Sequence, residues 1–125
     1  MSGTIMTVDD SPSMRMLLKA ALTDLGYKVL EAEDGVHALE RLGEVAAGAE
    51  PDLLITDINM PRLDGFGLIE KVREQDRHRN LPILVLTTES SDEKKQRARS
   101  AGATGWIVKP FHPDKLAAAI RRVLH

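Results

Sequence analysis

Residues 53–57 read Leu-Leu-Ile-Thr-Asp, a continuous apolar run that ends abruptly in a carboxylate. A second run of the same kind, Ile-Leu-Val-Leu-Thr, occupies residues 83–87. A strand with one face in water alternates apolar with polar side chains, and neither run shows this alternation. Uninterrupted apolar strands are typical of a parallel sheet that helices cover on both faces. The two runs therefore predict the central strands of an α/β fold.

Outward from these two runs, short apolar segments alternate with amphipathic ones along the whole chain. Further strands are predicted at residues 4–8, 27–32 and 105–108. A helix is predicted after each strand. The first two helices begin at residues 12 and 35, and the third and fourth cover residues 65–74 and 90–101. The fifth carries an apolar stripe over residues 116–124. This βα rhythm, repeated five times, predicts a (βα)5 doubly wound parallel sheet of five strands.

The segment after the first strand carries the clearest helix pattern. Ser11 suits an N-cap, and Pro12 suits the first helical position, where the missing N–H is not needed. Gly26 suits the position just past the end of the helix. Between these ends, apolar side chains recur at spacings of three and four, at Met14, Leu17, Leu18, Ala21, Leu22 and Leu25. We expect this set to face the core as one stripe.

Length and composition describe one ordinary globular domain. The chain has 125 residues and a formal net charge of -2, so we expect residues 1–125 to form a single domain without a separate output domain. It contains no cysteine, which excludes a disulfide framework and a thiolate metal site. No signal peptide is evident, and no segment approaches the roughly 18 apolar residues of a membrane span. We expect a cytoplasmic monomer without nucleic-acid or membrane partners.

Polar side chains stand where the predicted strands end. They are Asp9 and Asp10 after the first strand, Asp57 after the third, Thr87 at the end of the fourth and Lys109 after the fifth. Ligand sites of open parallel sheets lie outside the carboxyl ends of the strands, so we expect these groups to converge. Each has an ordinary alternative when taken alone, as a helix cap, a strand filler or a solvated charge. Those alternatives do not predict the combination.

A cluster of three carboxylates also predicts a cation. Like charges repel, and burial disfavours their ionised forms unless a positive charge lies among them. Mg²⁺ suits such a site, since it prefers oxygen ligands and keeps waters beside one or two carboxylates and a phosphate. It also makes a carboxylate usable as a nucleophile toward a phosphoryl group. Asp57 is the candidate phosphoacceptor, with Lys109 as a compact positive charge and Thr87 as a hydroxyl donor to the transferred group.

The chain resembles the receiver domains of two-component signalling, and within that family the single-domain regulators of chemotaxis. The match runs from residue 5 to residue 123. The motifs that carry it are Asp9-Asp10, Thr56-Asp57-Ile58-Asn59-Met60-Pro61 with Asp64-Gly65, Thr87, and Lys109-Pro110-Phe111. The resemblance implies a flavodoxin-like sheet with strand order 2-1-3-4-5. It also implies a regulator that phosphorylates and dephosphorylates itself rather than a turnover enzyme.

The resemblance assigns the metal ligands by position. Asp10, Asp57 and the backbone carbonyl of Asn59 are implied to bind Mg²⁺ directly. Asp9 is implied to act on the ion through a water molecule. These assignments place the whole metal site in two loops, one after the first strand and one after the third.

Further residue roles follow from the same resemblance. Thr87 is implied to be the switch hydroxyl, and Lys109 is implied to contact the phosphoryl group. Asn59 and Glu89 lie two positions beyond the phosphoacceptor and the switch hydroxyl, where the family lines the path of the water that removes the phosphoryl group. The Lys109-Pro110 peptide bond is implied to be cis, which only a bond before proline adopts at low energy.

One position departs from the family pattern. Trp106, the chain's single tryptophan, stands where the family mostly has a tyrosine or phenylalanine that turns inward when the switch hydroxyl moves. The indole either takes part in that movement or caps the edge of the fifth strand, and the sequence leaves both alternatives open.

The resemblance also implies the partners. They are a CheA-like histidine kinase as phosphodonor, a flagellar motor switch protein or another protein target, and a phosphatase. The implied docking face combines the fifth strand with the last two helices, the first of which is basic through Lys94, Lys95, Arg97 and Arg99. An alternative function is a phosphotransfer intermediate or phosphate sink without an output target.

Overall fold

The structure, a computed structural model, describes residues 3–124; residues 1, 2 and 125, which the expected domain includes, lie outside the described part. Its strands are parallel and lie in the order β2-β1-β3-β4-β5, which confirms the predicted fold class and strand order. The bounds are β1 Thr4–Val8, β2 Lys28–Ala32, β3 Leu53–Thr56, β4 Ile83–Thr87 and β5 Gly105–Val108. They match the prediction except that β2 begins one residue later than residue 27.

The two central strands are buried along their whole length. Every residue of β3 and of β4 is buried, as their uninterrupted apolar composition predicts. In the register of β1 and β3, Val8 pairs with Thr56. The next residues along these strands, Asp9 and Asp57, therefore leave the sheet at the same level and on neighbouring strands.

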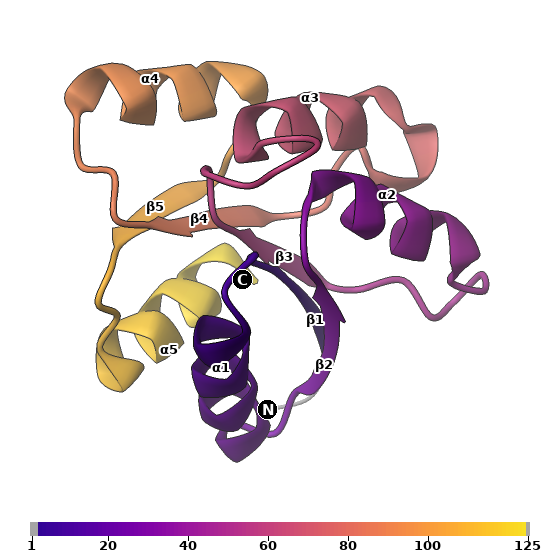
Figure 1. Ribbon diagram of the computed structural model, residues 1–125. Helices are drawn as coiled ribbons and strands as arrows, with labels where there is room; N and C mark the ends of the chain where they lie inside the picture. The colour runs from indigo at the N-terminus through magenta and orange to yellow at the C-terminus, as the bar shows by residue number, and fades with distance from the viewer. Residues whose placement is uncertain (1–2, 125) are drawn as a thin grey trace.

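The helices lie on both faces of the sheet, with α2, α3 and α4 on one face and α1 and α5 on the other (Figure 1). Their bounds are α1 Pro12–Asp24, α2 Gly35–Glu44, α3 Gly65–Glu74, α4 Asp92–Ala101 and α5 Pro113–Val123. A short 3₁₀ helix, η1 Asp76–His78, is an addition to the predicted elements. Within residues 3–124, no helix is both long enough and apolar enough to cross a bilayer.

Side-chain caps fix where several helices begin. Ser11, Asp34, Asp64 and Ser91 are N-caps, and each side chain accepts a hydrogen bond from the backbone N–H three residues later. Such a cap contributes about 0.5–2 kcal/mol to stability. The cap at Ser91 explains why α4 begins at Asp92 rather than at residue 90. Asp34 and Asp64 also end the loops that follow β2 and β3, at the same edge of the sheet as Asp9 and Asp57.

Two apolar clusters form the core, one on each face of the sheet. Residues of β3 and β4 alternate between them, because successive side chains of a strand point to opposite faces. Leu54 and Val85 pack with Ile69 of α3 in the cluster under α2, α3 and α4. Ile55 and Leu86 belong to the other cluster, under α1 and α5.

The predicted stripe of α1 is wrong at one position. Leu18 and Leu22 are buried against the sheet, but Leu17 is 58% exposed. Consecutive residues of a helix are separated by about 100° around its axis, so Leu17 and Leu18 cannot both face the same narrow contact. Met16 is also exposed, which leaves two large apolar side chains of α1 on the surface.

Candidate functional site

The carboxyl ends of β1, β3 and β5 bring Asp9, Asp57 and Lys109 together. The Nζ atom of Lys109 lies 2.8 Å from Oδ2 of Asp9 and 2.9 Å from Oδ2 of Asp57. Asp9 and Asp57 are only 2% and 8% exposed, so both ion pairs are largely shielded from water. The structure therefore brings together these three of the five groups that were expected to converge at the strand ends.

Asp10 adds a third carboxylate to this group. Asp9, Asp10 and Asp57 each offer one oxygen atom, and these atoms lie within 4.8 Å of one another. Asp10 is exposed, whereas the other two are buried. Mg²⁺ takes oxygen ligands in an octahedron and retains several waters, so a site with two shielded carboxylates and one open to solvent fits its chemistry.

Backbone groups fix the direction of the Asp57 side chain. The N–H of Ile58 donates to Oδ1 of Asp57 at 2.6 Å, which leaves Oδ2 facing Lys109. The N–H of Asp57 itself donates to the Val8 carbonyl at 2.9 Å. The carboxylate is thus tied to the end of β1 and presents one oxygen toward the cluster.

Lys109 is the cation that balances the two buried carboxylates. Burial alone would lower the pKa of Lys109, but hydrogen bonds with Asp9 and Asp57 and the charges of both outweigh it and raise the pKa above 10.5. The ammonium is therefore charged at neutral pH. Its backbone N–H donates to the Thr87 carbonyl at 2.7 Å, which ties it to the end of β4. The Lys109–Pro110 peptide bond is cis, as the resemblance implied.

Asn59, Glu89 and Lys94 form a polar chain beside the cluster. The Asn59 side-chain amide donates to Oε1 of Glu89 at 3.1 Å, and Nζ of Lys94 lies 3.0 Å from the same oxygen. The hydrogen bond from Asn59, followed by that from Lys94, lowers the pKa of Glu89 below its ordinary value. Glu89 also connects to the end of β4, because its backbone N–H donates to Oγ1 of the fully buried Thr87 at 3.3 Å.

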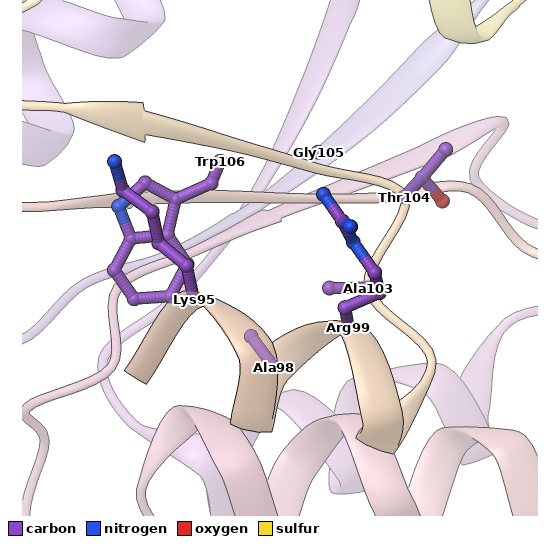
Figure 2. A pocket seen from close by; sticks show the side chains of 7 residues that line it. All are labelled: Lys95, Ala98, Arg99, Ala103, Thr104, Gly105 and Trp106. Atoms are coloured by element: carbon purple, nitrogen blue, oxygen red, sulfur yellow. The ribbon is translucent and has the colours of Figure 1, made fainter. Parts of the chain in front are cut away.

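Trp106 connects β5 to the same loop. Its indole N–H donates to the backbone carbonyl of Glu89 at 3.0 Å, and the side chain is partly buried. Figure 2 shows Trp106 pointing from β5 toward α4. Trp106 lines a cavity of about 80 Å³ between these two elements. The cavity is lined by Lys95, Ala98, Arg99, Ala103, Thr104, Gly105 and Trp106. The indole thus lies between the loop after β4 and a groove with two basic side chains.

Sequence reasoning missed several polar contacts that support these loops. Arg15 donates from Nη1 to the Asp9 carbonyl at 2.6 Å, and Arg62 forms two hydrogen bonds with the Asp34 carboxylate. Arg62 and Asp34 are 28 positions apart, and no spacing rule connects two loops at that separation. Nothing in the sequence pattern around either residue identifies the other as its partner.

Comparison with known proteins places this geometry in a family. The sequence model of one protein family, the response regulator receiver domain, matches residues 5–121. Chemotaxis protein CheY1 of Helicobacter pylori is 44% identical over 96% of this chain and 95% of its own length. The solved structure of chemotaxis protein CheY4 of Vibrio cholerae is 42% identical, with a TM-score of 0.90 over 98% of this chain and 99% of that one.

A more distant structure carries a metal. The receiver domain of sensor histidine kinase PA1611 from Pseudomonas aeruginosa is 27% identical, with a TM-score of 0.88 over 99% of this chain and 98% of that one. It is described with a magnesium ion coordinated in its active-site cleft. The family match covers nearly the whole chain, and the fold and strand order agree with it. The chain therefore belongs to the response-regulator receiver family, the phosphorylation-activated switches of two-component signalling, and is similar throughout to its chemotaxis members.

Proposed function

We propose that this chain is a cytoplasmic, monomeric signalling switch, a single receiver domain of residues 1–125 that accepts a phosphoryl group on Asp57. One observation carries the proposal, namely that three carboxylates and the ammonium of Lys109 meet at one edge of the sheet. This set offers an oxygen nucleophile, ligands for a divalent cation and a fixed positive charge. Phosphoryl transfer depends on such positioning and charge stabilisation more than on covalent chemistry by the protein.

The proposed metal is Mg²⁺, held by Asp10, Asp57 and the Asn59 carbonyl, with Asp9 acting through water. When bound, it would neutralise the charge that develops on the phosphoryl oxygens. The close approach of the three carboxylate oxygens supports this assignment, as does the magnesium-bound relative. The protein's own task is to hold these oxygens at one place despite their mutual repulsion, and the short loops after β1 and β3 do this.

In the proposed reaction, one oxygen of Asp57 forms a bond to the phosphorus of a phosphohistidine on a kinase. The bond between phosphorus and the imidazole nitrogen breaks, its electron pair stays on the nitrogen, and that nitrogen takes a proton from water. Lys109 contributes its charge to the transferred group, and the hydroxyl of Thr87 donates a hydrogen bond to it. Later attack of water on the phosphorus restores the carboxylate and releases inorganic phosphate.

The proposed output is a change of protein partner at the face of α4, β5 and α5. Phosphorylation brings close to two negative charges and three acceptor oxygens to Asp57, enough to reposition groups such as Thr87. The groove between α4 and β5 lies on this face, with Lys95 and Arg99 on its rim (Figure 2). We propose a CheA-like histidine kinase as donor and a flagellar motor switch protein or another protein as target, with a phosphatase as a further partner.

The acceptor is tested by labelling. Incubation with Mg²⁺ and acetyl phosphate is expected to add one phosphoryl group, which mass spectrometry detects and hydroxylamine removes as it does other acyl phosphates. Asp57→Asn is expected to abolish this labelling, because an amide is not a nucleophile toward phosphorus. Asp24→Asn, at the exposed end of α1, is the matched control and should label normally. Full labelling of the Asp57→Asn variant would refute the assignment.

A binding experiment separates the switch from the phosphate sink. A switch gains affinity for a target when a phosphoryl mimic occupies the site, whereas a sink exchanges phosphoryl groups with a kinase and gains no target. Immobilised protein is exposed to candidate motor proteins with Mg²⁺ alone and with Mg²⁺ plus beryllium fluoride. Retention of a target only with the mimic supports the switch, and phosphotransfer without any such retention supports the sink.

A further inference from the structure

The loop that carries Asp57 contains a turn with unfavourable backbone geometry. The loop joins β3 to α3 over residues 57–64, and Arg62 within it has a φ of 66°. The N–H of Leu63 donates to the Pro61 carbonyl at 2.7 Å, which closes a γ-turn centred on Arg62. A γ-turn with positive φ is rare and strained, and strained residues persist only where the surroundings fix them.

A bidentate ion pair between Arg62 and Asp34 fixes this turn. Nε of Arg62 donates to Oδ2 of Asp34 at 2.8 Å, and Nη2 donates to Oδ1 at 3.0 Å. The Asp34 side chain is only 5% exposed, although the guanidinium remains half in water. The hydrogen bond from Arg62 is the main reason that the pKa of Asp34 lies below its ordinary value. Paired hydrogen bonds of this kind specify geometry as well as charge.

The partner of the turn is itself held rigidly. Asp34 caps α2, since its Oδ1 accepts the His37 N–H at 2.9 Å. The next residue, Gly35, donates its N–H to the Leu63 carbonyl at 3.2 Å. A Cβ at Gly35 would lie 2.5 Å from that carbonyl oxygen, so the start of α2 presses directly against the loop. Arg62 and Leu63 are therefore attached to the end of a helix.

The other end of the loop is anchored to the sheet. The N–H of Gly65 donates to the Ile58 carbonyl at 2.9 Å, and a Cβ at Gly65 would lie 2.4 Å from the Asp57 carbonyl oxygen. Ile58 is anchored in turn through its N–H to the Asp57 side chain. Asn59 thus lies between one anchor at Ile58 and a second at Arg62. The direction of its carbonyl depends on both.

We propose that Arg62 is a positioning residue for the metal site, holding the loop through Asp34 so that the Asn59 carbonyl points at the cluster of carboxylates. This inference rests on the proposed Mg²⁺ site. Both side-chain hydrogen bonds that the structure describes for Arg62 go to Asp34, and neither goes to Asp10, Asp57 or Asn59. Its effect is transmitted through the backbone of residues 59–61. Among the described residues this segment has one more side-chain anchor to a charged group, the hydrogen bond from the Asn59 amide to Glu89, which holds the side chain rather than the carbonyl.

Two substitutions with opposite charge effects test the proposal. Arg62→Gln removes a positive charge, which by electrostatics alone strengthens binding of a cation nearby. Asp34→Asn removes a negative charge, which by electrostatics alone weakens it, and it keeps the cap because asparagine caps helices as well as aspartate. A positioning role predicts the same result for both, namely Mg²⁺ affinity reduced by about tenfold. Calorimetric titration of the unphosphorylated protein with MgCl₂ measures this without any activity assay.

Two further variants sharpen the result. The double variant is expected to be no weaker than either single one, because both changes break the same contact. Arg62→Gly relieves the strain at positive φ and should keep the fold stable, yet it should still lose Mg²⁺ affinity. Arg79→Gln and Asp76→Asn remove a pair of exposed charges in and beside η1 and are the matched controls, with unchanged affinity expected.

The possible outcomes are distinct. If Arg62→Gln binds Mg²⁺ as tightly as the wild type, or more tightly, Arg62 acts only through its charge or only on stability, and the proposal is overturned. If wild-type protein itself shows no Mg²⁺ binding, the proposed function fails instead. Hydrogen exchange supplies a second measurement, because loss of the ion pair between Arg62 and Asp34 should accelerate exchange at the N–H groups of Leu63 and Gly35 in the folded protein.

Discussion

Within the described part of the chain, Asp10 differs from Asp9 and Asp57 in forming no ion pair. Lys109 pairs with Asp9 and with Asp57, whereas Asp10 is exposed and shares the same few ångströms. Its charge therefore repels the other two without compensation. We predict that Asp10→Asn raises the urea midpoint in the absence of Mg²⁺, because it removes this repulsion.

The same change is expected to lower Mg²⁺ affinity by at least about tenfold, since it removes a ligand charge. Urea unfolding and calorimetric titration, each with and without MgCl₂, measure the two effects on one protein sample. Asp24→Asn removes a carboxylate of α1 outside the cluster and should change neither quantity. An unchanged or lower urea midpoint for Asp10→Asn would show that the carboxylates do not repel one another appreciably in the folded protein.

We propose that Asn59 and Glu89 line the path by which water reaches a phosphoryl group on Asp57. Their side chains are joined by a hydrogen bond of 3.1 Å that spans the loops after β3 and β4. Both can bond water, so both can help to admit the water that hydrolyses an acyl phosphate. We predict that Asn59→Leu, which is apolar and of the same length, prolongs the phosphorylated state by about threefold or more, a modest rise in the barrier.

Loss of label after removal of the phosphodonor measures that lifetime. Glu89→Leu is expected to act in the same direction, because it breaks the same hydrogen bond and also releases Lys94. Glu93→Leu, on the exposed first turn of α4, serves as the control. Equal lifetimes for the wild type and both site variants would mean that water reaches the phosphorus by another route.

Helix α2 depends on one carboxylate for its start and for its contact with the loop after β3. The pKa of Asp34 lies below its ordinary value of 3.8, first because Arg62 bonds to it. A group with a depressed folded pKa contributes stability above its ordinary pKa and loses that stability as the pH falls through the folded pKa. We therefore predict that Asp34→Asn is less stable than the wild type at neutral pH by about 0.5–1 kcal/mol, as for a half-exposed pair.

The difference between the two proteins should stay constant from pH 8 to about pH 5 and should shrink as the pH falls below 3.8. Urea unfolding at a series of pH values gives the free energy of unfolding of both proteins as a function of pH. The stability difference between the wild type and Arg62→Gln should shrink below pH 3.8 in the same way, since this substitution removes the partner of Asp34. A difference that grows toward low pH would show that Asp34 is stabilised in its protonated form.

Strands were easier to predict from this sequence than helix faces. The strands β1, β3, β4 and β5 begin and end at the predicted residues, because each apolar run is bounded by charged, threonine, proline or glycine residues. The failure at Leu17 has a different origin. Spacing identifies a broad apolar stripe on α1, but the width of the stripe that is buried depends on how α1 packs against β1 and β2, which the sequence of α1 does not contain.

Across the whole molecule, the sequence predicted the groups at the strand ends but not the contacts between loops. Asp9, Asp57 and Lys109 converge because parallel strands place their carboxyl ends at one edge, a rule independent of side-chain detail. The contact of Arg62 with Asp34 follows no such rule. It depends on a positive φ and on the close approach of two backbones, which only coordinates reveal.

A continuous series of contacts connects the carboxylate cluster with the groove between α4 and β5. Lys109 bonds both Asp57 and the Thr87 backbone, and Oγ1 of Thr87 accepts the N–H of Glu89. The Glu89 carbonyl in turn accepts the indole N–H of Trp106. Recruitment of the Thr87 hydroxyl by a phosphoryl group would therefore disturb the contacts of Glu89 and, through them, the environment of Trp106.

The single tryptophan makes this coupling measurable. We predict that beryllium fluoride with Mg²⁺ shifts the emission of Trp106 to the blue, because a displaced Thr87 leaves volume into which the indole can move. The shift should be moderate, since the indole is already partly buried and its N–H is bonded. Mg²⁺ alone offers Thr87 no new acceptor, and a ligand that does not distinguish two states cannot shift them. Emission is recorded for the apo protein, with Mg²⁺, and with Mg²⁺ plus the mimic.

Thr87→Ala is the decisive variant, because it keeps the metal site and removes the hydroxyl through which the signal is expected to pass. Its emission should respond to the mimic weakly or not at all. Ser91→Ala removes another hydroxyl, the cap of α4, and should leave the response intact while destabilising that helix slightly. A full response in Thr87→Ala, or an equal response of the wild type to Mg²⁺ alone, would assign Trp106 to the edge of β5 as a capping residue, with no part in the switch.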